Sequence, residues 1–86
     1  MAKLSPRAAR VVAAGEAAFG QRWQSALARA AGVPQSLLAM IAGGDREPTD
    51  DAYKQVAQGL MEEADRVRAT AKEIEKLARR MLRELE

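Results

Sequence analysis

The sequence predicts an all-α protein, and three observations support this. Alanine fills 19 of the 86 positions, and most other residues are Leu, Glu, Arg, Lys, Gln and Met, which favour helices. One Phe, one Trp, one Tyr and few β-branched residues leave little from which to build a sheet. No proline interrupts residues 50–86, so this stretch can form one helix of about 55 Å. We expect a compact head of four helices, the last of which continues as a long C-terminal helix.

The first two predicted helices have clear start and stop signals. Ser5-Pro6 begins the first, because a hydroxyl N-cap precedes a proline at the first helical position. Apolar residues follow at spacings of three and four until Gly20, which marks the helix end. The second helix covers 21–31 and stops at Gly32, a residue type that readily takes the left-handed conformation just past a helix.

The third helix is predicted over 34–42 and ends at Gly43-Gly44. After a polar loop, Thr49 caps the final helix, whose first turn is acidic and therefore suits the positive end of the helix dipole. We expect residues 1–60 to form the head. Residues 61–86 then form a dimerisation helix, continuous with the last helix of the head, which starts near residue 50.

The composition excludes most enzyme classes. The chain has no Cys and no His, so thiolate and imidazole metal ligands and Cys- or His-based nucleophilic triads are absent. Neighbouring carboxylates such as Asp50 and Asp51 point in different directions on a helix. We expect no enzyme activity, metal, cofactor or small-molecule ligand. No apolar run approaches the roughly 18–20 residues that span a bilayer, and the first residues lack a hydrophobic signal core. We therefore expect a cytoplasmic protein, in the bacterial cytoplasm or nucleoid, with no membrane partner.

Charge is unevenly distributed along the chain. Residues 1–48 carry six basic and three acidic side chains, whereas residues 49–86 carry eight basic and nine acidic ones. A positive N-terminal half fits a head that faces a polyanion, although an ordinary mixed surface gives the same count.

The final helix carries a heptad seam, by which we mean two interleaved series of residues spaced seven apart. Between Leu60 and Leu85 the seam contains the residues expected to mediate dimerisation: Leu60, Ala64, Val67, Ala71, Ile74, Ala78, Met81 and Leu85. The seam begins at Tyr53 and Ala57 and keeps its phase across Gly59, which favours one continuous helix even though glycine costs about 1 kcal/mol relative to alanine. We expect residues 53–64 to pack on the head. The part beyond overhangs the head and would self-associate, preferably antiparallel, because nothing fixes a parallel register.

The segment 24–43 has the spacing of a helix-turn-helix. A small residue, Ala28, lies where two short helices approach, Gly32 makes the turn, and Val33, Leu38 and Ile41 lock the second helix onto the first. This segment resembles the helix-turn-helix of lambda-repressor/Cro-type DNA-binding domains. It is also similar to small bacterial, phage or plasmid regulators whose amino-acid sequences follow roughly the pattern G-x-R-W-Q-x-x-L-A-x-x-x-G-V. This chain matches the pattern at Gly20, Arg22, Trp23, Gln24, Leu27, Ala28, Gly32 and Val33.

The resemblance implies a transcriptional regulator that binds double-stranded DNA, most simply a dimeric repressor acting on an inverted repeat. Helix 34–42 would enter the major groove, and two recognition helices would lie about 34 Å apart. The implied base-contacting residues are Gln35, Ser36, Ala39 and Met40. The implied phosphate-contacting residues are Gln24, Arg22, Arg46, Lys54 and Lys3, with Arg7 as an alternative to Lys3 in the N-terminal arm.

Two alternatives remain open at this point. Met40 belongs to the core if the third helix is rotated by one position. The third helix also lacks Lys and Arg, which favours a second reading of the chain as a protein-protein interaction module. Such a module would use the uncharged helix or the C-terminal Ala/Leu seam. Steep weakening by salt would indicate DNA binding, whereas an apolar helix interface would respond little.

Overall fold

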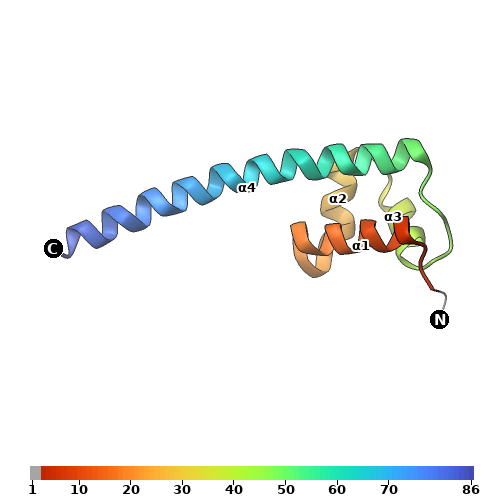
Figure 1. The fold of residues 1–86 in the computed structure, drawn as a ribbon, viewed down its shortest axis with the longest axis horizontal. Coiled ribbons are helices and arrows are strands. Elements are labelled where there is room, and N and C mark those ends of the chain that lie inside the picture. Colours follow the sequence, from red (N-terminus) through yellow and green to blue (C-terminus); the bar gives the residue numbers. More distant parts are fainter. Residues whose placement is uncertain (1–2) are drawn as a thin grey trace.

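The computed structural model describes residues 3–86, and all regular structure in this part of the chain is helical. The elements are α1 (Pro6–Phe19), the 3₁₀ turn η1 (Gly20–Arg22), α2 (Trp23–Ala31), α3 (Gln35–Ala42) and α4 (Asp50–Glu84). The molecule measures 57 × 26 × 19 Å, because α4 extends far beyond the three shorter helices (Figure 1). The prediction of an all-α chain with a long C-terminal helix is confirmed.

The helix caps follow the predicted chemistry. The N–H of Ala8 donates to Ser5 Oγ at 3.1 Å, and the N–H of Ala52 donates to Thr49 Oγ1 at 3.1 Å, so both predicted hydroxyl caps are made. Gly32 has φ 71° and ψ 33°, the left-handed conformation expected at the end of α2.

Two predicted boundaries are wrong by one or two residues. The second helix begins at Trp23 and not at 21, because Gly20–Arg22 forms the 3₁₀ turn. The third begins at Gln35 and not at 34, because Pro34 has φ −65° and ψ 139°, an extended conformation that places it before the helix.

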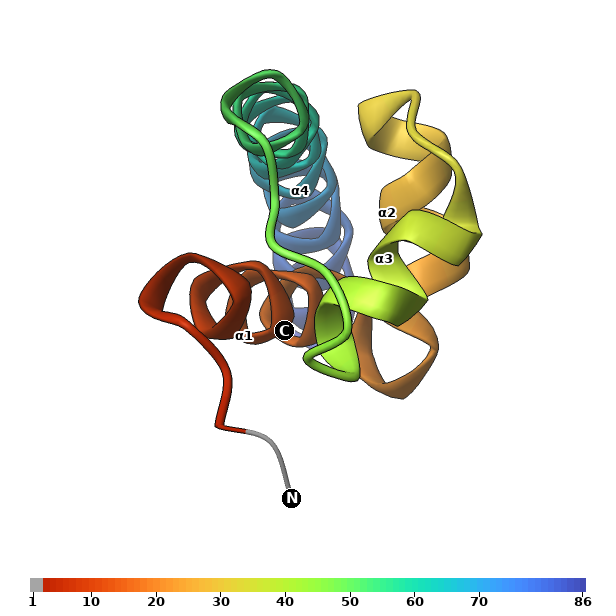
Figure 2. The same cartoon turned by 90° about the vertical axis from the view of Figure 1, so that its right-hand side faces the viewer.

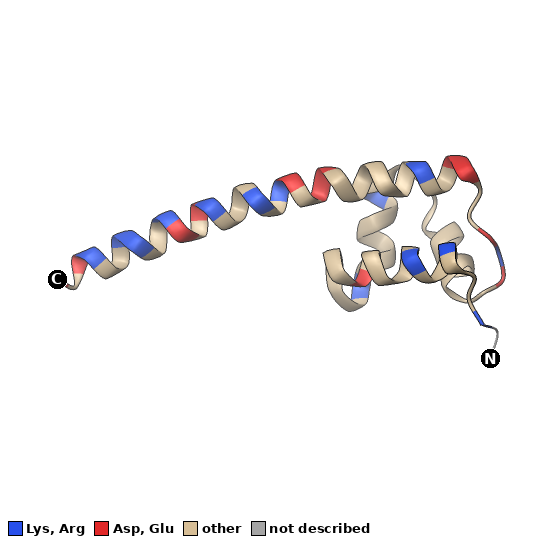
Figure 3. Ribbon diagram, in the orientation of Figure 1, with Lys and Arg blue, Asp and Glu red and all other residues tan. Residues whose placement is uncertain are grey.

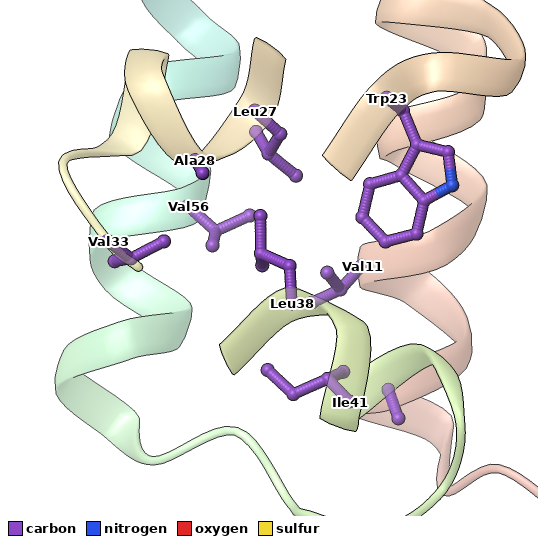
Figure 4. Close-up of a cluster of buried hydrophobic side chains, with 9 residues drawn as sticks. Val11, Trp23, Leu27, Ala28, Val33, Leu38, Ile41 and Val56 are labelled. Atoms are coloured by element: carbon purple, nitrogen blue, oxygen red, sulfur yellow. The ribbon is translucent and has the colours of Figure 1, made fainter. Parts of the chain in front are cut away.

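The core of the head lies where the four helices meet, as Figure 2 shows end-on. The largest fully buried side chains come from α1 (Val11), α2 (Leu27) and α3 (Leu38 and Ile41). Figure 4 shows them converging with Val56 of α4. On α1 and α3 the apolar residues predicted to face inward are the ones that pack in this core.

Two glycines allow close contacts inside the head. A Cβ added at Gly15 would lie 2.3 Å from Cε3 of the buried Trp23 ring. A Cβ added at Gly59 would lie 2.9 Å from the Cα of Ala31 and 3.0 Å from the carbonyl oxygen of Ala30. The absence of a side chain at Gly59 therefore lets α4 cross the end of α2 at backbone contact, which explains a glycine inside a long helix.

The face of α4 that packs on the head is displaced from the heptad seam. Its buried residues are Ala52, Val56, Gly59 and Glu63. The prediction that the first part of the seam packs on the head is right for Tyr53 and Leu60, which lie partly buried against the core. It is wrong for Ala57, which is exposed.

Beyond the head, residues 65–86 form a projecting segment that we call the stem, and every residue in it is exposed. Of the predicted dimerisation residues, Leu60 and Ala64 are partly buried at the head, whereas the other six lie on the stem. The exposed fraction is 49% for Val67, 61% for Ile74, 64% for Met81 and 84% for Leu85.

Candidate nucleic-acid interface

Helices α2 and α3 form a tight pair joined by a short turn. The N–H groups of Gly32 and Val33 both donate to the carbonyl oxygen of Ala28, at 2.9 and 3.1 Å, which closes the end of α2. The side chain of Val33 is buried directly after the turn, and Leu38 then holds α3 against the core. The turn glycine and the apolar residues on either side of it therefore fix how α3 lies on the head.

The outer face of α3 carries the four residues predicted to contact bases. Gln35, Ser36, Ala39 and Met40 are all exposed, whereas Leu38 and Ile41 on the same helix are 0% and 1% exposed. Met40 has an exposed fraction of 36%, so the alternative that places Met40 in the core is wrong. The structure brings these four residues together on one surface.

The N-terminal end of α3 is positive without carrying a charged side chain. No residue of α3 is charged, as the uniform tan of this helix in Figure 3 shows. Pro34 precedes the helix and makes no side-chain cap, so no side-chain oxygen neutralises the partial positive charge of the first-turn amides. An anion near Gln35 is therefore electrostatically favourable.

The predicted phosphate-contacting residues fall in separate places. Lys3 and Arg46 line one hollow of about 330 Å³ between the N-terminal arm and the loop that follows α3. Arg22 lies just after the C-terminal end of α1, whereas Lys3 lies before its N-terminal end. The 14 residues of α1 between them span about 21 Å. Lys54 is exposed on α4, and Gln24 is partly buried on α2. None of the ion pairs within residues 3–86 involves these basic side chains.

A cluster that the sequence analysis missed joins α1 to the start of α4. Arg7 Nη1 lies 2.6 Å from Asp50 Oδ1, and the Arg7 guanidinium lies 4.7 Å from the centre of the Tyr53 ring. Arg10 Nη1 donates to the Tyr53 hydroxyl at 2.9 Å. Arg7 thus lies in α1 and is engaged within the head, so a phosphate contact by Arg7 would have to displace its ion pair with Asp50. Arg7 and Asp50 are 43 residues apart in the sequence, so no local pattern could have revealed their ion pair.

At the boundary between head and stem, Glu63 is the one buried charged residue in the described part of the chain. Arg66 Nε donates to Glu63 Oε1 at 2.8 Å, and Arg66 Nη2 donates to the other carboxylate oxygen. These hydrogen bonds lower the pKa of Glu63 and raise that of Arg66. The pair therefore stays ionised where α4 leaves the head.

Two other kinds of site are absent from residues 3–86. No cluster of three or more acidic, Cys or His side chains is arranged to hold a metal ion there. No helix in these residues combines the length and apolar character needed to cross a membrane. Comparisons with protein families, with curated proteins and with solved structures found no match to this chain.

Proposed function

We propose that this chain is a sequence-specific DNA-binding transcriptional regulator, a dimeric repressor whose α3 enters the major groove of double-stranded DNA. The observation that carries the proposal is the α2–α3 pair, two short helices joined by a tight turn at Gly32, which leaves the four predicted base-contacting residues exposed on one face of α3. On that face Gln35 and Ser36 occupy the first turn, where this type of helix reads base edges.

The chemistry of this face fits base contacts. The Gln35 amide can pair with adenine through two hydrogen bonds, and the Ser36 hydroxyl can donate or accept. Ala39 and Met40 offer apolar surface for thymine methyl groups. The uncapped N-terminus of α3 adds an attraction to phosphate that does not need a charged side chain.

Positive charge around the head supports binding to the DNA backbone. Arg46 and Lys3 lie together beyond the C-terminal end of α3, in a hollow that Asp45 and Glu47 also line, and neither basic residue takes part in an ion pair within residues 3–86. Lys54 and Arg22 add further exposed charge. These groups would fix orientation on the duplex, while α3 would supply sequence preference.

The test uses a duplex selected by the wild-type chain from a random pool. Gln35→Ala is expected to weaken binding to that duplex by about 1–3 kcal/mol, or roughly 5- to 150-fold, and to relax preference at one base pair. The matched control is Gln58→Ala, which removes an exposed glutamine from α4 instead. Equal effects of the two variants would contradict the proposed role of α3.

A second variant separates backbone contact from base contact. Arg46→Ala is expected to weaken binding to all sequences alike and to reduce the slope of log K against log salt by about 0.9 for each head. A variant that changed sequence preference and left the salt slope unchanged would place Arg46 on a base.

One observation favours a protein-protein interaction module as a second candidate. The exposed face of α3 is uncharged and includes Met40, which suits an apolar partner as well as a groove. Failure of the chain to bind any duplex from the random pool at low salt would favour this candidate.

A further inference from the structure

We propose that residues 60–86 of α4, the stem and the turn of helix before it, pair with the same segment of a second copy in one antiparallel register, in which facing seam residues have numbers that add to 145. In this register Leu60 faces the partner's Leu85, Ala64 the partner's Met81, Val67 the partner's Ala78, and Ala71 the partner's Ile74. This deepens the dimer of the proposed function. It rests on α4 alone and does not require DNA binding.

The order of residue sizes along the seam selects the antiparallel direction. One series is large (Leu60, Val67, Ile74 and Met81), and in the other only Leu85 is larger than alanine. In a parallel pair each residue meets its own copy, so wide layers of two large side chains alternate with narrow layers of two alanines. In an antiparallel pair the two series face each other, so nearly every layer joins a large residue to an alanine and the helices keep one spacing.

The residues that flank the seam select the register. Met61 and Leu82 are 64% and 65% exposed, and the proposed register brings them together across the pair. It also brings Arg68, which is paired with Asp65 of its own chain, near the partner's Glu75, which is paired with Arg79, so that two intrachain ion pairs join across the interface. If the partner helix were shifted by seven residues toward the head, Arg68 would face the partner's Arg68 and Leu82 would face the partner's Lys54.

One like-charge approach accompanies this register. Glu63 comes near the partner's Glu84, but the Glu63 carboxylate is already held by two hydrogen bonds from Arg66. The approach is therefore compensated within each chain, and the Arg68 pair of the shifted register is likewise compensated by Asp65. The contact between Met61 and Leu82 therefore decides between the two registers.

The head supplies a second, steric reason for the same register. Before residue 60 the seam lies beside α1: Arg10, Val11 and Ala14 of α1 line an apolar hollow of about 130 Å³ together with Tyr53, Val56, Ala57 and Leu60 of α4. A partner helix that ended opposite Leu60 would stop at this boundary. The shifted register would place the partner's Leu85 opposite Tyr53, where Arg10 already donates to the tyrosine hydroxyl.

The pairing has a consequence for the two heads. They lie at opposite ends of the dimer, and the two copies of Val56 are about 50 Å apart along the helix axis. This exceeds the separation of about 34 Å expected from the sequence for half-sites one DNA turn apart. Together with the proposed function, it predicts half-sites spaced by more than one turn.

Cysteine cross-linking tests the register directly, because the chain has no cysteine of its own. The double variant Ala64→Cys/Met81→Cys is expected to oxidise to a covalent dimer, since the two positions face each other across the pair. Within one chain they lie about 25 Å apart along α4 and cannot bond. The matched control Ala57→Cys/Met81→Cys, which faces only in the shifted register, is expected to remain uncross-linked, as are Ala64→Cys and Met81→Cys alone.

Each other outcome overturns the inference. A covalent dimer of Ala64→Cys alone would indicate parallel pairing, and one of the 57/81 variant would indicate the shifted register. The wild-type mass, measured by sedimentation, is expected to be twice the 9.3 kDa of one chain. A monomer at all concentrations would refute the pairing without relying on any variant. These measurements involve no DNA, so their results test the pairing of α4 independently of the Gln35 variant, which tests DNA binding.

Discussion

Because α4 crosses the end of α2 at Gly59, we expect replacement of this glycine by alanine to destabilise the fold, which is the opposite of what helix propensity alone predicts. Replacing glycine by alanine inside a helix normally stabilises it by about 1 kcal/mol. At Gly59 the added Cβ would lie 2.9 Å from the Cα of Ala31 and 3.0 Å from the carbonyl carbon and oxygen of Ala30. These are backbone atoms, so they cannot turn aside as a side chain does.

The magnitude follows from two opposing contributions. Overpacking a well-packed core costs about 1–3 kcal/mol, which exceeds or cancels the propensity gain of about 1 kcal/mol. We expect Gly59→Ala to lower the free energy of unfolding by about 1 kcal/mol, with a range of about 0–2 kcal/mol from the same two contributions.

Urea unfolding measures this change, with fluorescence of the buried Trp23 as the signal from the head. The neighbouring exposed position supplies the control. Gln58→Ala should be more stable than Gln58→Gly by about 1 kcal/mol, because only propensity acts there. If Gly59→Ala were stabilising by the same amount, α2 and α4 would not cross at backbone contact and the reasoning would be refuted.

The remaining predictions concern α3 and Glu63. Leu38→Ala should lower the free energy of unfolding by about 2–5 kcal/mol, because the side chain is 0% exposed, whereas Met40→Ala on the outer face should change it by less than about 0.5 kcal/mol. Similar losses in denaturant unfolding would mean that α3 is rotated. The hydrogen bonds from Arg66 lower the pKa of Glu63 in the folded chain, so their stabilisation is fully present above the unfolded pKa of about 4.3. It is lost as the pH falls through the folded value. The difference in unfolding free energy between wild type and Glu63→Gln should therefore shrink on acidification, and a difference that is constant with pH would contradict this role.

Local signals in the sequence were sufficient to predict the helices. Ser5 and Thr49 cap helices through their own hydroxyl groups, and Gly32 adopts the conformation that only a glycine takes easily. The errors at 21–22 and 34 are boundary errors, because neither a 3₁₀ turn before a helix nor an extended proline before a helix can be told from helix by the spacing of apolar residues.

Contacts between distant segments were not predictable from these patterns. The sequence showed that Gly59 lowers the helix propensity of α4, but it did not show why a glycine is needed there. The close approach of Ala30 and Ala31 depends on the angle at which α2 meets α4. The engagement of Arg7 by Asp50 and Tyr53 is of the same kind. The exposed face of α3 was predictable because Leu38 and Ile41 fix which side turns inward, and the other side follows from helix periodicity.

The measurement that tests the central proposal most directly is selection of duplexes from a random pool, followed by affinity measurements at two salt concentrations. We expect the wild-type chain to enrich a shared sequence. Four phosphate contacts in each head, from Lys3, Arg22, Arg46 and Lys54, would weaken binding to it about a hundredfold per head between roughly 50 and 200 mM salt. Failure to enrich any sequence, with no duplex bound at the lower salt concentration, would contradict DNA binding by α3.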